Sequence, residues 1–232
     1  MHHVHLESTD STQTYLKQNL EALRTIEQNV LVSTSKQMAG YGRSDNEWEF
    51  LENALAFSFT LEPNEELTLT SLEIGVLLTK FFKSYDNLEL LLKWPNDLLS
   101  PEQAKVGGIL CTYKDPKTIL VGVGINVGKM SIDKNKFPYP VASLSEDLIL
   151  KEEDYMEMPR AIYDYILANR IRKNALKEQW DKVCIHLHQK VRIVDGANET
   201  KGIFRGIDHD GSALLDVDGK MTKVITGSLF MN

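Results

Sequence analysis

Hydrophobic and polar positions along the first half of the chain predict a mixture of helices and strands. Apolar residues recur at helical spacing in residues 14–24 and 68–85. Residues 54–60 instead alternate large apolar side chains with small or polar ones, which is typical of a strand with two unlike faces. Further apolar runs that predict strands lie at residues 29–33, 88–94, 107–113 and 118–126.

The pattern changes in the second half of the chain. Residues 154–178 predict one long helix, which Pro159 should interrupt. In the last part, short strand patterns are separated by Asp-Gly pairs at 195–196, 210–211 and 218–219, and such pairs favour hairpin turns. We therefore expect an α+β domain over residues 1–186, followed by a small all-β barrel over residues 187–232.

Composition narrows the class of protein. The 232 residues carry 33 acidic and 26 basic side chains, a formal net charge of −7, which disfavours a protein that coats nucleic acid. No apolar run is long enough for a membrane helix, and the first residues do not form a secretory signal. Cys111 and Cys184 are expected to be free buried thiols, which favours the cytoplasm. We expect His2, His3 and His5 to belong to a frayed terminus.

Five polar or glycine-bearing stretches do not suit a packed core. They are Asp10-Ser11-Thr12-Gln13, residues 37–48 with Gly40, Gly42 and Arg43, Lys93-Trp94-Pro95-Asn96-Asp97, Lys105-Val106-Gly107-Gly108, and Gly122-Val123-Gly124-Ile125-Asn126. The first also reads as a helix N-cap, and the third also reads as a turn. The paired glycines allow a ligand or another backbone to approach closely, and the cations suit a phosphate or a carboxylate.

Several other kinds of site are absent from the sequence. The glycine stretches match neither the dinucleotide fingerprint nor the P-loop, and no nucleophile elbow occurs. His186 and His188 are expected to alternate on a strand and lack a third metal ligand. Cys111 has no identifiable activating partner. The sequence therefore offers no identifiable side-chain nucleophile.

Taken in order, the five stretches resemble the biotin protein ligase family. The family motifs DST(Q/N), QxxGxGR, KWPND, KxGGIL and GxGIN occur in sequence, and residues 202–220 resemble its C-terminal barrel. The resemblance implies a central mixed sheet with helices, of the class II synthetase-like type, and a small SH3-like barrel. It also implies that biotin and ATP with Mg²⁺ give biotinyl-5′-AMP, from which biotin passes to a lysine of a biotin carboxyl carrier protein of acetyl-CoA carboxylase.

The resemblance also implies roles for particular residues. It assigns biotin contacts to Ser11, Thr12, Gln13, Gln37, Gly40, Tyr41, Gly42, Arg43, Lys105, Gly107 and Gly108. It assigns ATP or adenylate contacts to Arg43, Trp48, Lys93, Asn96, Asp97, Lys105 and Asn126. Lys105 and Arg43 take the catalytic roles, and no side chain is assigned to a metal.

The chain departs from the family pattern in the glycine loop. Where relatives carry an arginine-rich GRGRRGRxW, this chain reads GYGRSDNEW, with Tyr41, Ser44, Asp45 and Asn46 in the altered positions. We expect the loop to release the adenylate more readily, which a slow release of biotinyl-AMP would contradict. The first motif begins at Asp10, which leaves no room for the DNA-binding domain of some relatives, so no specific DNA binding is expected.

Two alternative functions remain open at this stage. A lipoate ligase or octanoyltransferase shares the catalytic fold, and a non-catalytic biotin- or nucleotide-binding module could carry an altered loop. KWPND, KxGGIL and the barrel favour biotin over lipoate, and Arg43, Lys105 and Asn126 favour an enzyme over a sensor. The sequence fits either a monomer or a homodimer.

Overall fold

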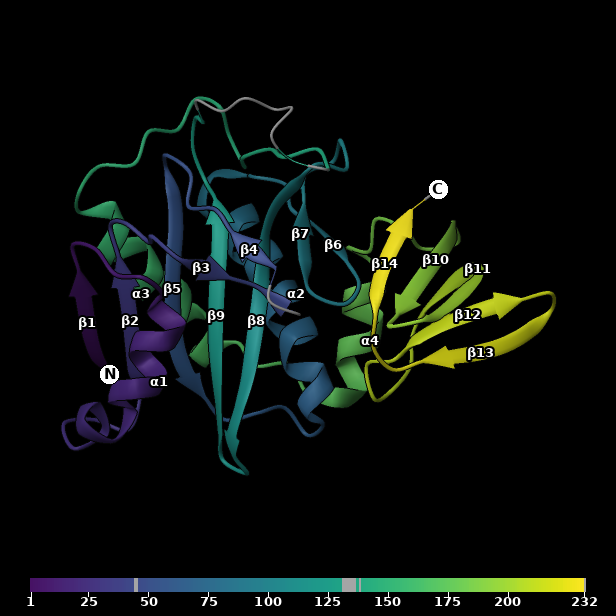
Figure 1. Cartoon of the computed structure of the whole chain (residues 1–232), viewed down its shortest axis with the longest axis horizontal. Helices are drawn as coiled ribbons and strands as arrows, with labels where there is room; N and C mark the ends of the chain where they lie inside the picture. The colour runs from purple at the N-terminus through teal and green to yellow at the C-terminus, as the bar shows by residue number, and fades with distance from the viewer. Residues whose placement is uncertain (44–45, 131–136, 138, 232) are drawn as a thin grey trace.

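The computed structural model describes the chain except for residues 44–45, 131–136, 138 and 232. Figure 1 shows a large sheet with helices on both faces and a second, smaller sheet at the C-terminal end. The large sheet consists of β1 (His2–Leu6), β2 (Val30–Thr34), β5 (Ala54–Leu61), β6 (Leu91–Lys93), β7 (Asp97–Leu99), β8 (Lys105–Asp115) and β9 (Thr118–Asn126). Its strand order is β1-β2-β5-β9-β8-β7-β6.

The expectation of a mixed sheet is confirmed. β1 pairs with β2 in parallel, whereas β2 with β5, β5 with β9, and β9 with β8 pair in antiparallel fashion. Helix α1 (Thr12–Arg24) packs on one face, and α2 (Leu67–Asp86) and α3 (Asp154–Ala168) pack on the other. On β2, Val30 and Val32 contact the α1 side while Leu31 joins the larger core, as the two-residue period of a strand requires.

The two faces of the central strands differ in side-chain size. Leu55, Phe57 and Phe59 of β5 enter the larger core, and Ser58 lies on the face that α1 covers. β9 repeats this arrangement, because Ile119, Val121, Val123 and Ile125 are core residues. The alternation therefore leaves small or polar side chains under the N-terminal end of α1.

The C-terminal residues form a five-stranded antiparallel sheet in the order β13-β12-β11-β10-β14. Its strands are β10 (Lys190–Asp195), β11 (Asn198–Ile207), β12 (Ala213–Val217), β13 (Lys220–Val224) and β14 (Ser228–Met231). The predicted Asp-Gly turns are confirmed, since Gly196, Gly211 and Gly219 have φ of 59°, 83° and 82°. The outer strands β13 and β14 do not pair within the described residues, so the small β unit is an open sheet rather than a closed barrel.

The small sheet packs against the helices and the β6–β7 turn that lie beside the large sheet. Helix α4 (Lys173–Asp181) contacts β11, and one hydrophobic cluster includes Trp94 of the large unit and Phe204 of the small one. The buried indole Nε1 of Trp94 donates a hydrogen bond to Gly211 O at 3.0 Å. The boundary at residues 186/187 stays a prediction, although β10 begins close to it.

The prediction of a frayed N-terminus is wrong. His2, His3 and His5 lie in β1, whose backbone pairs with β2. His3 Nε2 and His5 Nδ1 each lie 2.8 Å from Ser33 Oγ, so side chains as well as backbone tie the strand down. Burial lowers the pKa of His3 to about 4, and its imidazole is therefore neutral near pH 7.

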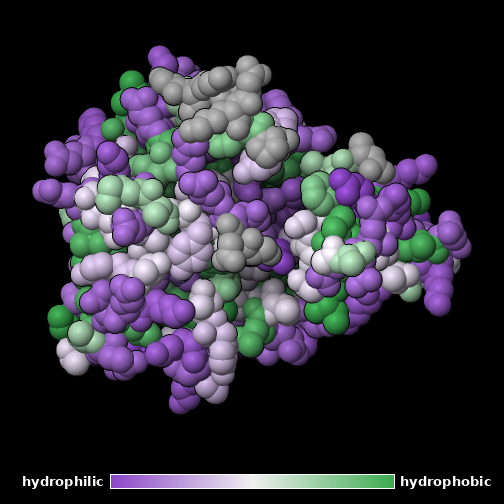
Figure 2. Space-filling model, in the orientation of Figure 1, coloured by the Kyte–Doolittle hydropathy of each residue, from purple (hydrophilic) through white to green (hydrophobic). Residues whose placement is uncertain are grey.

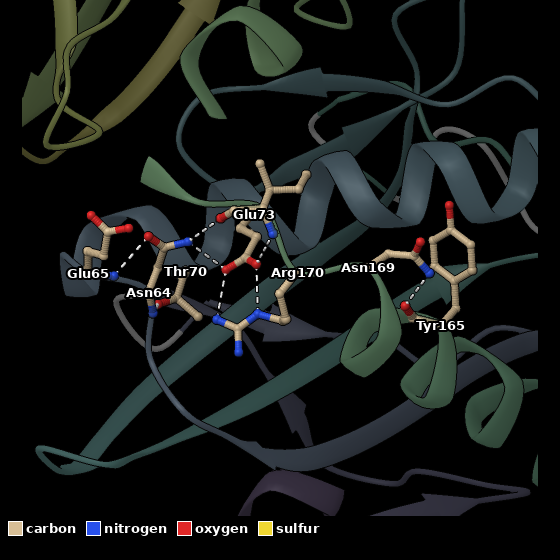
Figure 3. A network of polar contacts seen from close by, with 8 residues as sticks. Asn64, Glu65, Thr70, Glu73, Tyr165, Asn169 and Arg170 are labelled. Atoms are coloured by element: carbon tan, nitrogen blue, oxygen red, sulfur yellow. Dashed lines mark hydrogen bonds and ion pairs between the residues drawn. The ribbon is translucent and has the colours of Figure 1, made fainter. Parts of the chain in front are cut away.

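The predicted long helix is interrupted, but not at Pro159. Pro159 lies inside α3, and the helix continues through it to Ala168. The chain leaves the helix after Ala168 because Arg170 and Ile171 turn toward the buried carboxylate of Glu73 on α2. Figure 3 shows this network, in which Arg170 Nε, Arg170 Nη2 and Ile171 N donate to Glu73 at 2.7, 3.0 and 2.8 Å.

Two further expectations about strands need correction. His186 and His188 lie in a turn rather than a strand, and His188 has a φ of 64°. His186 packs against the rings of Phe204 and Trp180, with centroids 4.3 and 6.0 Å away. The strand expected over residues 88–94 is shorter, and only Leu91–Lys93 pair with β7.

In the part of the chain that the structure describes, none of the helices has the length and apolar character needed to cross a membrane.

Candidate functional site

The candidate site lies on the α1-covered face of the large sheet, where two glycines of β9 support side chains from other elements. A β-carbon on Gly122 would lie 3.0 Å from Gln13 Oε1, and one on Gly124 would lie 2.6 Å from the indole of Trp48. A larger residue at Gly124 would displace the indole of Trp48, and one at Gly122 would push the Gln13 amide away by a few tenths of an ångström. The expected close approach to this strand is thus confirmed, and it brings Gln13 and Trp48 over neighbouring positions of β9.

Gln13 presents an acceptor that the protein does not use. Its Nε2 donates to Leu120 O and to Thr112 Oγ1, both at 3.1 Å. Leu120 O can only accept, so this contact sets the orientation of the amide. Gln13 is buried, and its Oε1 has no hydrogen-bond partner among the described residues. A buried acceptor without a partner is costly, which indicates that a ligand N–H completes it.

The start of α1 is joined to the glycine loop by a chain of hydrogen bonds. Gln37 Oε1 accepts from Thr12 N at 2.9 Å and from Thr12 Oγ1 at 3.4 Å. Thr12 Oγ1 also lies 2.9 Å from Ser58 Oγ on β5. Ser11 is the N-cap of α1 and accepts from Thr14 N at 3.3 Å, so the capping interpretation of this motif is confirmed.

The glycine loop contains a short hairpin of β3 (Gly40–Tyr41) and β4 (Glu47–Trp48). A β-carbon on Gly40 would collide with Gln37 Nε2, and Tyr41 OH lies 3.4 Å from Thr14 Oγ1. The hairpin thus closes over the start of α1. Trp48 Nε1 is buried and also lacks a partner within the described chain. Of the altered loop positions, Ser44 and Asp45 lie outside the described residues.

Two lysines converge on one carboxylate at the edge of this face. Lys93 Nζ lies 2.7 Å from Asp97 Oδ2, and Lys105 Nζ lies 2.7 Å from Asp97 Oδ1. Burial raises the pKa of Asp97, but Lys105 and Lys93 outweigh it and hold that pKa below its ordinary value of 3.8. Asp97 therefore stays ionised near neutral pH and holds both ammonium groups in place.

Arg43 adds a third cation beside the β6–β7 hairpin, which carries Lys93 and Asp97. Its Nη1 donates to Asn96 Oδ1 at 3.4 Å, and Asn96 is itself oriented because its Nδ2 donates to Ile109 O at 2.7 Å. Burial lowers the pKa of Arg43 from 12.5, while Asp97 and Asp195 counteract the shift. An arginine guanidinium remains charged at physiological pH, so three cations surround the β6–β7 turn.

Arg43 also reaches the C-terminal unit. Its Nη1 donates to Gly227 O and its Nη2 to Thr226 Oγ1, each at 3.3 Å. A cavity at this junction is lined by Arg43, Asp195, Thr226, Gly227, Ser228 and Phe230, among others. Figure 2 shows hydrophilic surface where the two units meet. The small sheet therefore forms part of the wall around Arg43.

Asn126 ends β9 with a second unused acceptor. Its Nδ2 donates to Ala142 O at 3.1 Å, and because a carbonyl cannot donate, Oδ1 must face the other way. Oδ1 is buried and has no partner among the described residues. Gln13, which lies over Gly122, and Asn126, which ends β9, thus each present an unused amide oxygen.

The structure brings the predicted motifs together on one side of the sheet. Strand pairing places Gly108 beside Asp97 and Gly124, and Ser58 beside Gly122. Gly107 has a packing role, since a β-carbon there would lie 2.5 Å from Gly124 O. Ser58 and Thr112 also belong to this site but were not predicted. The alternation of β5 could have indicated Ser58, whereas nothing in the sequence singles out Thr112.

Neither cysteine is suited to nucleophilic catalysis. Burial raises the pKa of Cys111 and of Cys184 to about 12, so both thiols stay protonated. Burial also lowers the pKa of His186, beside Cys184, to about 3. Across residues 1–43, 46–130, 137 and 139–231, no three His, Cys, Asp or Glu side chains are grouped to hold a metal. What the described site does offer is cations and unused acceptors.

Comparison with known families covers both parts of the chain. The sequence model of the biotin/lipoate A/B protein ligase family matches residues 5–129. That of the biotin protein ligase C-terminal domain matches residues 186–231. The first match includes the cations, Gln13 and Asn126, and the second spans all five strands of the small sheet.

Individual proteins agree with these matches. The bifunctional ligase/repressor BirA of Salmonella typhimurium is 27% identical over 232 residues, covering 95% of this chain and 71% of the relative. A biotin–[acetyl-CoA-carboxylase] ligase of Paracoccus denitrificans is 26% identical, with 90% and 92% of the two chains covered.

The fold is also shared with solved structures. The biotin protein ligase of Aquifex aeolicus in complex with biotin and ATP superposes with a TM-score of 0.79 and 24% identity, over 100% of this chain and 99% of the other. A biotin protein ligase of Leishmania major with biotinyl-5-AMP gives a TM-score of 0.60 at 18% identity, over 96% and 98%. At these identities the likeness establishes the fold.

Proposed function

Because the chain belongs to the biotin/lipoate A/B protein ligase family, we propose that it is a biotin protein ligase. It activates biotin with ATP to give biotinyl-5′-AMP and pyrophosphate. It then transfers the biotinyl group to a lysine of a biotin carboxyl carrier protein, with release of AMP. The C-terminal match favours biotin over lipoate, since that model describes biotin protein ligases specifically.

The observation that carries this function is the group of three cations at the β6–β7 turn. Lys93 and Lys105 share Asp97, and Arg43 donates to the neighbouring Asn96. In the first step a carboxylate approaches the α-phosphate of ATP, and these two anions repel each other. Cations held in fixed positions reduce that repulsion and stabilise the charge that develops on the phosphate. Lys105 and Arg43 would take these roles directly.

The second step needs no nucleophile from the protein. A neutral lysine amine of the carrier attacks the acyl carbon of the mixed anhydride, the C–N bond forms, and the bond to the phosphate oxygen breaks. The proton lost from the amine passes to solvent, and AMP leaves as an anion. Lys105 and Arg43 would stabilise that leaving group, while the site's main contribution is to hold the reacting groups in line.

The biotin and nucleotide sides follow from the polar groups on this face of the sheet. Biotin's ureido group needs donors and acceptors within a largely apolar pocket, and Ser11, Thr12, Gln13 and Gln37 offer them. The glycine loop would cover biotin with Gly40, Tyr41 and Gly42. Strand β8 would border biotin with Gly107 and Gly108. Trp48, Asn126 and the β6–β7 turn would contact ATP.

Mg²⁺ would enter with ATP rather than as a resident metal. Asp97 is already committed to two lysines, so its carboxylate is a poor magnesium ligand. Magnesium commonly binds through substrate phosphates and retains several waters, and here it would add charge neutralisation to that of Lys105 and Arg43.

The cellular setting follows from the same proposal. Cytoplasm supplies ATP and carrier protein, and the two free cysteines fit a reducing compartment.

One experiment distinguishes the candidate functions. The protein is incubated with ATP, Mg²⁺, a biotin carrier domain and either biotin or lipoate, and the carrier is weighed by mass spectrometry. A mass increase equal to one biotinyl group is expected. A lipoyl increase would assign the protein to lipoate transfer, and an unchanged carrier would favour a binding module.

Substitution of Lys105 tests the assigned mechanism. Lys105→Ala should lower the rate of adenylate formation by about 100-fold or more, because one charged group that stabilises the transition state is lost. Pyrophosphate release measures this step directly. Lys114→Ala is a matched control, because Lys114 lies on the same strand but pairs at the surface with Glu21. Equal rates for the two variants would remove Lys105 from the mechanism.

A further inference from the structure

β1 is the outermost strand of the large sheet and carries two histidines on the face that α3 covers. His3 and His5 are two positions apart, so their side chains point to the same face of the strand. His3 Nε2 and His5 Nδ1 each lie 2.8 Å from Ser33 Oγ of β2, and His5 Nε2 lies 3.0 Å from Ser35 Oγ. Ser35, His5, Ser33 and His3 thus form one chain of hydrogen bonds, and Ser33 in its middle is fully buried.

The hydrogens of this chain limit the number of protons that it can hold. Ser33 has one hydroxyl hydrogen between two ring nitrogens, so at least one imidazole must donate to its oxygen. With one imidazole protonated, every contact still joins a donor to an acceptor. With both protonated, two N–H groups point at Ser33 Oγ, and the hydroxyl hydrogen has no acceptor in the chain. The second proton therefore costs a buried hydrogen bond and places two cations beside one oxygen.

The surroundings of His3 also oppose a positive charge. Burial, His5, Arg160 of α3 and His2 all lower the pKa of His3, whereas Asp164 of α3 raises it. The result is a pKa of about 4, and the ring is neutral near pH 7.

His5 follows the same direction. Burial lowers its pKa from 6.5, and Glu152, which lies just before α3, opposes the shift. A strand released from the sheet would bind protons at the ordinary value of 6.5, and the attached strand binds them less well. The attachment of β1 is therefore at full strength above pH 6.5 and weakens as the pH falls toward the value of about 4 for His3.

The end of β1 is joined by its backbone to the glycine loop. Ser35, which His5 contacts, donates from its backbone N to Leu6 O at 3.0 Å. Thr9 N then donates to Lys36 O at 3.0 Å. The two segments continue directly into the first motif of the site and into the glycine loop. A change at β1 can therefore reach both of these parts of the site.

We propose that His3, Ser33, His5 and Ser35 form a pH-sensitive latch, which holds β1 on the sheet near neutral pH and releases it in acid. Release of β1 loosens the two segments that lead to the first motif and the glycine loop. The latch itself is independent of the proposed ligase function, whereas its effect on biotin affinity rests on that function.

Hydrogen exchange at residues 2–6 tests the latch. Protection factors, which correct for the intrinsic effect of pH on exchange, are measured at pH 7 and pH 5. In the wild type they should fall roughly 5- to 20-fold, as expected for a half-buried histidine with a pKa of about 4 in place of 6.5. His3→Gln keeps a polar group near Ser33 but cannot titrate, so the fall should shrink to about twofold, the part that His5 contributes.

His209→Gln is the matched control, because His209 is exposed on the C-terminal unit, and it should behave as the wild type does. A constant protection factor in the wild type, or an equal fall in His3→Gln, would overturn the latch. If His3→Gln does not fold, magnetic resonance titration of the wild-type imidazoles replaces it. A midpoint near pH 4 for His3 is expected, and a midpoint near 6.5 would overturn the proposal.

Calorimetric titration with biotin at pH 7 and pH 5 measures the coupling to the site. The wild type should lose at least about twofold more affinity between these pH values than His3→Gln does, because only its β1 is released. Equal losses would refute the coupling. Absence of biotin binding at both pH values, with protection factors that behave as expected, would refute the ligase function and leave the latch in place.

Discussion

Asp97 shows how one residue can organise the charge of a whole site. Two lysines within 2.7 Å of its oxygens would repel each other without it. The carboxylate is mostly buried and contacts both ammonium groups, so its negative charge is more favourable in the folded chain than in water. At this scale, the role of Asp97 is to hold the side chains of Lys93 and Lys105 close together.

The stability that Asp97 contributes should depend on pH in one direction. Its pKa is depressed in the folded state, so the contribution is fully present above the unfolded value of 3.8 and is lost as the pH falls through the folded value. Asp97→Asn should lower the free energy of unfolding by about 1–3 kcal/mol at pH 7. Urea titrations from pH 8 to pH 3 measure the difference, which should remain constant to about pH 4 and then shrink.

Asp86→Asn provides the comparison, because Asp86 is exposed at the end of α2. Its effect should be small throughout the range. A difference between wild type and Asp97→Asn that grows as the pH falls would contradict the charge-paired role of Asp97.

At the scale of elements, β9 acts as the support for the site because its glycines permit contact with α1 and with the β3–β4 hairpin. Gln13 reaches over Gly122, and Trp48 lies against Gly124. Val121, Val123 and Ile125, which alternate with these glycines, point into the core on the opposite face. One face of β9 therefore supports the site, and the other packs in the core. Strand alternation alone produces this division.

Gly124→Ala should therefore act through Trp48. The new methyl group would displace the indole, which starts 2.6 Å from the β-carbon position. If Trp48 stacks on the nucleotide base, ATP affinity should fall by about 5- to 150-fold, the range of 1–3 kcal/mol for such stacking. Calorimetric titration with ATP measures this loss. In a Trp48→Ala background the same substitution should cause no further loss, and additive effects would show that Gly124 acts independently.

The junction of α2, α3 and α4 depends on the fully buried carboxylate of Glu73. Glu73→Gln should lower the free energy of unfolding by about 2–4 kcal/mol. Arg170 would lose its charged partner, and the new NH2 group of the glutamine would face N–H donors where a carboxylate oxygen now accepts. Urea denaturation measures the change, with the exposed Glu89→Gln as control. Equal stability of the two variants would show that the network in Figure 3 contributes little.

At the scale of the whole molecule, the C-terminal unit is an integral part of the fold. The hydrophobic cluster continues through both units, and Trp94 bonds across their junction to Gly211. Arg43 crosses the same junction to Thr226 and Gly227. The small sheet therefore contributes to the position of the β6–β7 turn and of the cations around it.

The two units should accordingly unfold in one transition. Tryptophan fluorescence and far-ultraviolet circular dichroism should give coincident urea curves. Trp94→Phe should lower the free energy of unfolding by about 1–3 kcal/mol, because the buried Gly211 carbonyl loses its donor. Trp48→Phe is the matched control, since its indole N–H has no partner among the described residues. Two separate transitions would show that the units are independent.

Local patterns were enough to predict most of the elements and the motifs of the site. The prediction failed where distant residues override local preference. The segment with His2, His3 and His5 forms a strand because its backbone pairs with β2 and its side chains contact Ser33. Helix α3 ends at Ala168 because Glu73 binds Arg170. Thr112 joins the site only through its hydrogen bond from the Gln13 side chain, far away in the chain, which no local pattern contains.

The sequence by itself determined the order of strands and helices, the hairpin turns and the residue types that the chemistry requires. It did so because side-chain period, proline and Asp-Gly pairs act over a few residues. Only the tertiary structure decided that Lys93 and Lys105 share Asp97, that Arg43 reaches the small sheet, and that Gln13 and Asn126 keep one oxygen free. These arrangements join residues far apart in the chain, and strand pairing and core packing bring them together.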